Sequence, residues 1–188
     1  MSLDPKFFAR EPVIVARDLI GVTLLLDGVG GIIVETEAYD PLDPASHSFG
    51  GKTARNASMF GPPGCAYVYR SYGIHWCMNF VAHKSRIGGG VLIRALEPTH
   101  GIAIMEARRG CERPKLLCSG PGRLGQALAI TRALDGLNLN APPFALSKRQ
   151  KRFPVVVGPR IGLSRGVETP WRFGLKGSEF HSRGFPAT

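Results

Sequence analysis

The chain has 188 residues, of which 44% are hydrophobic and 20% are charged, proportions typical of one globular domain with its own core. Its 24 basic and 14 acidic residues give a net charge of +10, which favours a polyanionic partner, with nucleic acid first; a ribosome-associated or merely basic protein would show the same excess. No apolar run approaches the roughly 20 residues of a membrane-spanning helix, and the N-terminal residues lack the organisation of a secretory signal. We therefore expect one domain over residues 1–188, in the cytoplasm, with no membrane partner.

The predicted elements are short, because 24 glycines and 15 prolines are spread along the chain. Residues 17–26 are apolar and predict either a strand or the end of a short helix, and residues 30–39 predict a strand framed by glycines. Residues 67–69 and 74–81 are separated by a Ser-Tyr-Gly break and predict a β-hairpin with Tyr72 at its tip.

The second half of the chain predicts further strands and one helix. Residues 90–96 predict a strand, and residues 124–134, which follow Gly120-Pro121-Gly122, predict a helix. A basic stretch at 147–152 precedes a predicted strand at 155–157, and residues 165–188 predict a strand followed by a tail that is loose from about residue 178. We expect a mixed α/β (α+β) fold in which β-structure predominates.

The four cysteines are Cys65, Cys77, Cys111 and Cys118, and no two of them form the Cys-x-x-Cys pair that anchors a zinc site. Cys111 and Cys118 stand seven apart, but no further thiolates follow to hold an iron–sulfur cluster. We predict reduced thiols and no metal.

Two acidic residues in the strand at 30–39 are the first candidates for chemistry. Side chains of a strand alternate between its faces, so Glu35, Glu37 and Tyr39 should lie on one face together with Ile33. A Glu-x-Glu pair on a solvated sheet edge would have no special role. Alternatively, a carboxylate removed from water beside an aromatic wall can act as a general base.

The loop and hairpin that follow each allow two interpretations. His47 is either a stacking wall or an ordinary loop residue, and Lys52, Thr53 and Arg55 suit either phosphate contacts or a solvated turn. Most of the hairpin aromatics should fill the core. Tyr72, at the tip, is placed to wedge between bases and fill the space of an extruded nucleotide, or else it folds back onto the sheet.

Asn79 and Arg123 are two further candidates. The alternation of the hairpin's second strand places Asn79 on the face opposite Trp76, Met78 and Phe80, where it either projects toward a pocket or is a buried structural amide. Arg123, at the start of the predicted helix, allows a backbone phosphate contact, although a plain helix cap would look the same.

Several of these residues belong to motifs through which the chain resembles the alkyladenine (3-methyladenine) DNA glycosylase family, as a compact bacterial member. The resemblance runs in unbroken order over about residues 15–135, with weaker agreement at 160–162 and 170–177. Its motifs are VETEAY at 34–39, ASHS at 45–48, RN at 55–56, MF at 59–60, YVY at 67–69, YG at 72–73, CMN at 77–79, VLIRALEP at 91–98, LCSGP at 117–121 and QALAI at 126–130.

The resemblance implies a role for individual residues. Glu37 matches the general base that activates water, which makes Glu35 secondary, and Arg94 matches a catalytic position near that water. Tyr72 matches the wedge, and Ile74 beside it, with Lys52, Thr53, Arg55 and Arg123, is expected to contact DNA. Tyr39, His47 and Tyr69 match the walls that sandwich the flipped base, and Asn79 matches the residue that clashes with the 2-amino group of normal guanine. The base pocket is implied to contain Tyr39, Ala45, His47, Tyr69, Asn79 and Leu92.

The resemblance also implies a single domain with a curved antiparallel sheet, flanking helices and a protruding β-hairpin. It implies a monofunctional glycosylase, without metal or organic cofactor, that acts as a monomer on double-stranded DNA containing damaged purines, near the nucleoid of a bacterium or in a eukaryotic nucleus. Ile74 and His75 depart from the Met and Tyr of mammalian members, which leaves substrate breadth open. The alternative class is a catalytically inert nucleic-acid-binding module, for which Glu37 would be dispensable.

Overall fold

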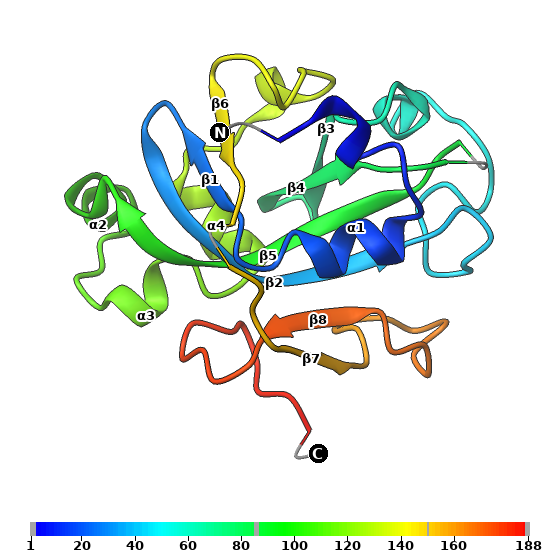
Figure 1. The fold of residues 1–188 in the computed structure, drawn as a ribbon. Coiled ribbons are helices and arrows are strands. Elements are labelled where there is room, and N and C mark those ends of the chain that lie inside the picture. Colours follow the sequence, from blue (N-terminus) through cyan, green and yellow to red (C-terminus); the bar gives the residue numbers. More distant parts are fainter. Residues whose placement is uncertain (1–2, 85–86, 150, 187–188) are drawn as a thin grey trace.

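A computed structural model describes residues 3–84, 87–149 and 151–186 as one mixed α/β domain built on a curled antiparallel sheet (Figure 1). The strand order is β3-β4-β5-β2-β1-β6, with β8 also on β2 and β7 on β8. The strands are β1 (Thr23–Leu26), β2 (Val29–Tyr39), β3 (Ala66–Ser71), β4 (His75–Val81), β5 (Gly90–His100), β6 (Phe144–Ser147), β7 (Val155–Gly158) and β8 (Arg172–Leu175).

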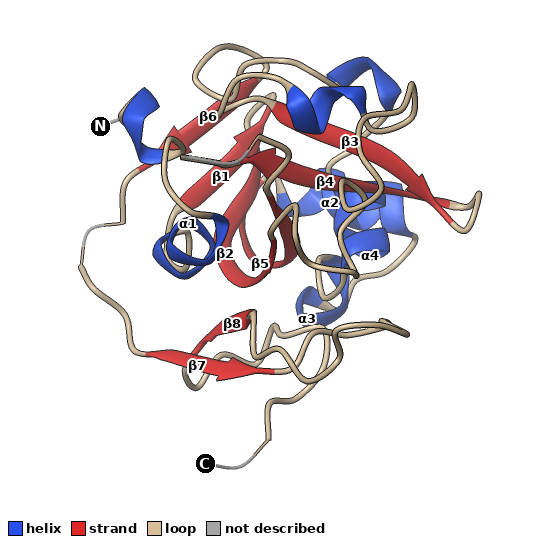
Figure 2. Ribbon diagram, turned by 90° about the vertical axis from the view of Figure 1, so that its right-hand side faces the viewer, coloured by secondary structure: helices blue, strands red, loops and turns tan. Residues whose placement is uncertain are grey.

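The helices are short and lie on the outside of the sheet. They are α1 (Pro12–Asp18), α2 (Ile102–Arg109), α3 (Pro114–Leu117) and α4 (Pro121–Ala127), with 3-10 turns at Pro5–Phe7, Ala57–Phe60 and Arg132–Leu134. The helices α2, α3 and α4 form one group in both views, away from α1 (Figures 1 and 2). No described helix has the length and apolar character that crossing a bilayer requires.

Strand β2 organises the sheet because it pairs with three others. Strand β5 runs along one edge of β2, whereas the opposite edge pairs first with β1 and then, from Glu35 to Glu37, with β8. The β2–β5 register shifts on both sides of Glu35, leaving Val34 on β2 and Arg94 on β5 without direct partners. Bulges of this kind change the direction in which side chains point. These two lie on either side of Glu35, next to the candidate site.

The two faces of β2 have different surroundings. Thr36 donates its hydroxyl to the carbonyl of Ala16, 2.8 Å away, so α1 covers the Thr36 face. Glu35, Glu37 and Tyr39 share the other face, as predicted, because all three take part in contacts with Arg94 or with each other there. Ile33 instead belongs to the main hydrophobic core, since the register changes between Ile33 and Glu35.

The β3–β4 hairpin extends beyond the rest of the sheet (Figure 2). At its tip Tyr72 and Gly73 have φ of 49° and 68°, and the amide of Ile74 donates to the carbonyl of Ser71 over 3.0 Å. Positive φ at both central residues is the pattern of a type I′ turn, which glycine adopts freely but tyrosine only at a cost. Tyr72 is 87% exposed, so it does not fold back onto the sheet.

The strand predictions and the fold class are confirmed, and residues 17–26 turn out to contain both the end of α1 and β1. The helix predicted at 124–134 is wrong in its bounds: it starts at Pro121 and ends at Ala127. Ala129, with φ of 53°, terminates it, and the amide of Ile130 donates back to the carbonyl of Gly125. This is a Schellman-type ending with alanine at the position that glycine usually occupies, so the sequence carries no stop signal there.

The expectation of a loose tail from about residue 178 is wrong as far as Gly184. The amide of Ser182 donates to Glu35, and Arg172 donates to the carbonyls of Arg183 and Gly184. The segment is therefore fixed against β2 and β8 by hydrogen bonds to residues far away in the sequence, which its own composition does not predict. In the basic stretch at 147–152, Gln150 lies outside the described residues.

Candidate active site

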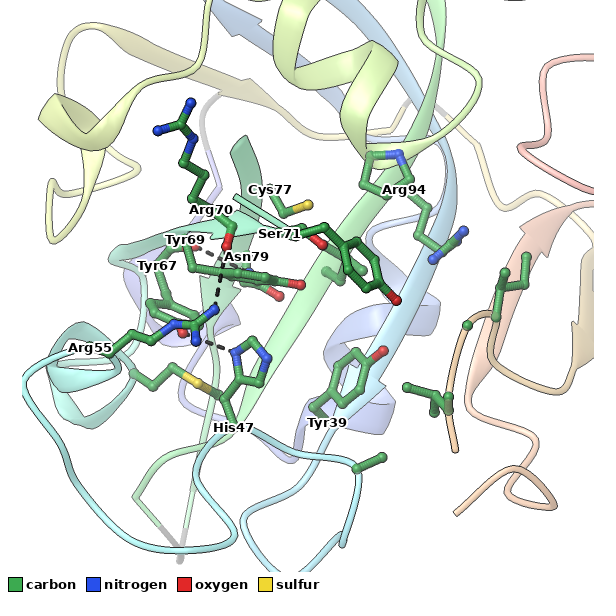
Figure 3. Close-up of a pocket in the computed structure, with 18 of the residues that line it drawn as sticks. Tyr39, His47, Arg55, Tyr67, Tyr69, Arg70, Ser71, Cys77, Asn79 and Arg94 are labelled. Atoms are coloured by element: carbon green, nitrogen blue, oxygen red, sulfur yellow. Dashed lines mark hydrogen bonds between the residues drawn. The ribbon is translucent and has the colours of Figure 1, made fainter. Parts of the chain in front are cut away.

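A cavity of about 630 Å³ opens between the hairpin, strands β2 and β5, and two loops, a volume in the range of small-molecule and base pockets. Figure 3 shows how the side chains of Tyr39, His47, Tyr69 and Arg94 surround it. Its lining consists of Tyr39, Ala45, His47, Arg55, Met59, Tyr67, Tyr69, Arg70, Ser71, Tyr72, Gly73, Cys77, Asn79, Leu92, Arg94, Pro121, Ile161, Gly162 and Leu163.

Glu37 lies behind the floor of this cavity and is fully buried. Its Oε2 accepts hydrogen bonds from the Tyr39 hydroxyl at 2.9 Å and from Arg94 Nη1 at 3.1 Å, and its Oε1 accepts from the amide of Ile161 at 2.7 Å. All three donors belong to residues that line the cavity. An ionised carboxylate has about four acceptor positions, so one position is left for a further donor.

Glu35 is also fully buried, but all its bonds face the protein. Its carboxylate accepts from Arg94 Nε at 3.1 Å, from Arg172 Nε at 2.7 Å, and from the amide and hydroxyl of Ser182. Burial would raise the pKa of Glu35, but Arg94, Ser182 and Arg172 outweigh it and hold that pKa below its ordinary value. The interpretation of the two acids as a solvated sheet edge is wrong, because both are fully buried and form ion pairs with the buried Arg94 and Arg172.

Arg94 connects the two acids. Burial would lower the pKa of its guanidinium, but the carboxylates of Glu37 and Glu35 outweigh burial and raise it. The bulge that leaves Arg94 without a direct partner on β2 accompanies the turn of its side chain toward both acids. A fixed positive charge therefore stands at the cavity floor beside Glu37.

Tyr39 is held as a neutral hydrogen-bond donor. Burial, followed by the charge of Glu37 and the bond to it, raises the pKa of the Tyr39 phenol far above its ordinary value. The hydroxyl therefore keeps its proton and donates it to Glu37, while the ring faces the cavity.

Three aromatic rings stand together on the other side of the cavity. His47 meets Tyr69 edge to face with ring centroids 4.5 Å apart, and Tyr67 stacks on Tyr69 at 5.5 Å. His47 Nδ1 and the Tyr67 hydroxyl form a 3.0 Å hydrogen bond. Burial and the nearby Arg55 lower the pKa of His47, and burial raises that of Tyr67 to about 12 and that of Tyr69 further, so all three rings are uncharged near neutral pH.

The deep end of the cavity is formed by buried residues of β4 and β5. Asn79 is buried and donates through Nδ2 to the carbonyl of Tyr67 at 3.2 Å, which fixes its amide at the pocket wall. Cys77 is beside it, and burial raises the pKa of this thiol, so it is not a thiolate nucleophile near neutral pH. Leu92 on β5 pairs with Asn79 and also lines the cavity.

Comparison with known proteins identifies the family. A family model described as methylpurine-DNA glycosylase (MPG) matches residues 6–179. Chain-length relatives carry provisional names as 3-methyladenine DNA glycosylases: one from Rhodopseudomonas palustris (strain BisB18) is 59% identical, covering 98% of this chain and 94% of its own length. One from Nitrosospira multiformis is 60% identical (98% and 96%), and one from Rhizobium meliloti is 58% identical (98% and 98%).

The chain belongs to the methylpurine-DNA glycosylase family. It is a DNA glycosylase, a hydrolase of N-glycosyl bonds that acts on DNA in base-excision repair. The positive charge of the chain agrees with that partner.

Nine of the residues singled out from the sequence line the glycosylase cavity. They are Tyr39, Ala45, His47, Arg55, Tyr69, Tyr72, Asn79, Leu92 and Arg94. Arg55 is at the mouth, where its Nη2 donates to the carbonyl of Arg70. Glu37 contacts the lining from behind, as described above.

Four predicted DNA-contact residues lie outside the cavity. Lys52 and Thr53 are exposed, and Thr53 bonds to the side chain of Asn56, which closes the loop on itself. Ile74 is 67% exposed beside Tyr72. Arg123 donates to the Ser119 hydroxyl at 2.9 Å and, with His75, borders a separate shallow hollow.

Sequence reasoning missed the loop that closes the cavity opposite the aromatic rings. Ile161, Gly162 and Leu163 line the cavity, and the Ile161 amide bonds Glu37. The weak match at 160–162 was the only sequence signal for it. The contribution of Arg172 and Ser182 to the carboxylate network had no signal, because these residues meet Glu35 only in three dimensions.

Proposed function

We propose that this DNA glycosylase extrudes a damaged purine from duplex DNA into the 630 Å³ cavity and hydrolyses its N-glycosidic bond with water activated by Glu37. The substrates are alkylated or deaminated purines of the class that contains 3-methyladenine, 7-methylguanine, hypoxanthine and ethenoadenine. The observation that carries the proposal is the fully buried Glu37 carboxylate, bonded to three residues of the cavity floor and with an acceptor position to spare.

The β3–β4 hairpin is the element that extrudes the base. An exposed aromatic on a projecting turn can enter the base stack and occupy the space that the flipped nucleotide leaves. Tyr72 has that exposure and also lines the mouth of the cavity, so the wedge and the pocket are adjacent. Arg55 and Arg70, at the same mouth, place positive charge where a phosphate backbone would pass.

Recognition of the base rests on uncharged aromatic faces. A cationic alkylpurine is attracted to an aromatic ring by its quadrupole, whereas a charged imidazolium would repel it. Tyr39 faces the cavity from β2, and His47 and Tyr69 face it from the opposite side. Asn79, fixed by its bond to the Tyr67 carbonyl, is placed to clash with the 2-amino group of normal guanine.

Hydrolysis needs one base and a stabilised sugar cation. The water oxygen attacks the anomeric carbon, Glu37 accepts the water proton, and the glycosidic electron pair leaves with the purine. A purine methylated at N3 or N7 is already positive and leaves as a neutral base without an added proton. A neutral purine such as hypoxanthine leaves with the electron pair as an anion, which then takes a proton from water. The carboxylate also stabilises the oxocarbenium-like sugar, and the hydrogen bond from Arg94 Nη1 orients it.

The nature of the products follows from this chemistry. Because water is the nucleophile, the products are a free base and an intact abasic strand, and no strand cleavage follows. We expect a monomer that works without a metal or organic cofactor, in the bacterial cytoplasm with the nucleoid DNA.

Base release from duplex oligonucleotides with single defined lesions tests the proposal, with alkali added afterwards to cleave abasic sites. Wild type should give alkali-dependent cleavage, and Glu37→Gln should lower the rate at least about a hundredfold while lesion binding persists. Asp18→Asn is the matched control, since Asp18 is paired with Arg10 and Arg149 at the end of α1. If wild type and Glu37→Gln bind lesion DNA alike and neither releases a base, the protein is an inert binding module.

A further inference from the structure

Arg160 is buried directly behind one wall of the cavity without lining it. Its guanidinium carbon lies 4.8 Å from the centroid of the Tyr39 ring and 5.4 Å from that of the Trp171 ring. Its Nη1 also donates to the carbonyl of Ala38 at 3.0 Å. Tyr39 is therefore held by a cation against its ring and by Glu37 at its hydroxyl.

The same guanidinium holds the loop that carries the opposite wall. Both of its terminal nitrogens donate to the buried carboxylate of Asp43, in the two-pronged geometry that fixes position as well as distance. Asp43 in turn accepts from the amide of Ala45 through its side chain and from the amide of Ser46 through its carbonyl. These bonds set the backbone just before His47.

A third connection runs to the loop at 161–163. Arg160 Nη2 donates to the carbonyl of Gly166 at 3.2 Å, and the next residue, Ile161, donates its amide to Glu37 at 2.7 Å. One side chain thus joins Tyr39, the loop before His47 and the loop that contacts the carboxylate.

We propose that Arg160, paired with Asp43, is a positioning residue that sets the separation of the pocket walls and so determines which damaged bases react. It acts through Tyr39 and Asp43 and touches no substrate. This inference rests on the proposed function, because it assumes that a base is held between those walls.

Removing Arg160 should affect neutral and cationic bases unequally. A neutral base such as hypoxanthine leaves only when it is accurately placed against the catalytic groups, and a displacement of about 1 Å can lower a rate about a hundredfold. A cationic 7-methylguanine is already activated as a leaving group and tolerates a looser pocket. Loss of Arg160 therefore narrows the range of lesions toward cationic bases.

Arg160→Gln and Arg160→Lys are the two variants that test this role. Lysine keeps the positive charge opposite Asp43 but cannot bond the carboxylate of Asp43 and two carbonyls in one plane. We therefore expect Arg160→Lys to show the same change in lesion range as Arg160→Gln, without leaving the carboxylate of Asp43 unpaired. Arg149→Gln is the matched control: Arg149 is a half-buried arginine that pairs with Asp18 and the carbonyl of Ile20, outside the cavity. Thermal unfolding establishes the folded fraction of each variant.

The measurement is single-turnover release of hypoxanthine and of 7-methylguanine from otherwise identical duplexes, over a range of protein concentrations. In both Arg160 variants we expect the hypoxanthine rate to fall about tenfold or more and the 7-methylguanine rate about threefold or less, with a higher half-saturating concentration for hypoxanthine. Arg149→Gln should keep the wild-type ratio of the two rates.

Two results would overturn the inference: a wild-type ratio in both Arg160 variants, or a uniform fall for both bases in proportion to the folded fraction. The second result would mean that Arg160 only stabilises the fold. If wild type itself releases neither base, the proposed function fails, and the inference fails with it. A change of ratio in Arg160→Lys alone still supports the inference where Arg160→Gln does not fold.

Discussion

The carboxylate of Glu35 accepts hydrogen bonds from both the amide and the hydroxyl of Ser182, a residue 147 positions further along the chain. The same carboxylate bonds Arg94, which bonds Glu37. The C-terminal segment and the candidate general base are therefore joined through one buried network.

Glu35→Gln should destabilise the protein by about 3–5 kcal/mol, because it leaves two buried arginines with one fewer counter-charge. Urea unfolding measures this loss. Ser182→Ala removes one hydroxyl bond to the same carboxylate and should cost only about 1–3 kcal/mol. Equal stabilities of Glu35→Gln and wild type would show that the network does not hold the C-terminal segment.

Tyr72→Ala should weaken action on duplex DNA without weakening the fold. The side chain is 87% exposed, so its loss removes little packing and the unfolding midpoint should stay within experimental error of wild type. Release from a paired duplex should fall about tenfold, since stacking of an aromatic on a base contributes about 1–3 kcal/mol. Release from single-stranded DNA should change much less, because no partner base then has to be kept stacked; equal losses on both substrates would contradict a wedge.

Asn79→Ser tests exclusion at the deep end of the pocket. A shorter side chain removes the amide that Asn79 holds against the wall through the Tyr67 carbonyl, and opens space for an exocyclic amino group. Release of undamaged guanine should rise about tenfold, the scale of discrimination that one steric contact supplies. Hypoxanthine, which lacks that amino group, is the internal control, and a parallel rise for both bases would point to general loosening instead.

Local patterns in the sequence predicted the parts of the site that lie within one element. Alternation placed Glu35, Glu37 and Tyr39 on one face of β2, and the Ser-Tyr-Gly break placed Tyr72 at the hairpin tip. The family motifs then indicated nine of the residues that line the cavity.

The missed features depend on contacts between distant segments. Arg160 bonds Asp43, which is 117 positions away in the sequence, and neither residue lies in a local pattern that predicts this pairing. The bulge at Arg94 depends on how β5 pairs with β2, which alternation within one strand cannot predict. The end of α4 was missed because a left-handed alanine replaces the usual glycine signal.

The lowered pKa of His47 gives the base pocket a pH dependence of known sign. Burial, with the charge of Arg55 nearby, keeps this pKa below its ordinary value of about 6.5, so His47 is neutral near pH 7. The stability that neutral His47 contributes is fully present above about pH 6.5, the pKa of the unfolded state. Below that pH the unfolded state binds the proton first, so this stability is lost as the pH falls to the lower pKa of the folded state. Once protonated, His47 would repel a cationic purine on its ring face.

Release of 7-methylguanine should therefore decline more steeply than release of hypoxanthine as the pH falls below about 6.5. His47→Phe keeps an aromatic wall that cannot titrate. In this variant the release rates of the two lesions should fall equally at acid pH, because any remaining fall is due to other groups of the site. Single-turnover rates across this range check the prediction, with unfolding measured at each pH to correct for the folded fraction. If 7-methylguanine release keeps its steeper decline in His47→Phe, the charge that opposes the cationic base is not on His47.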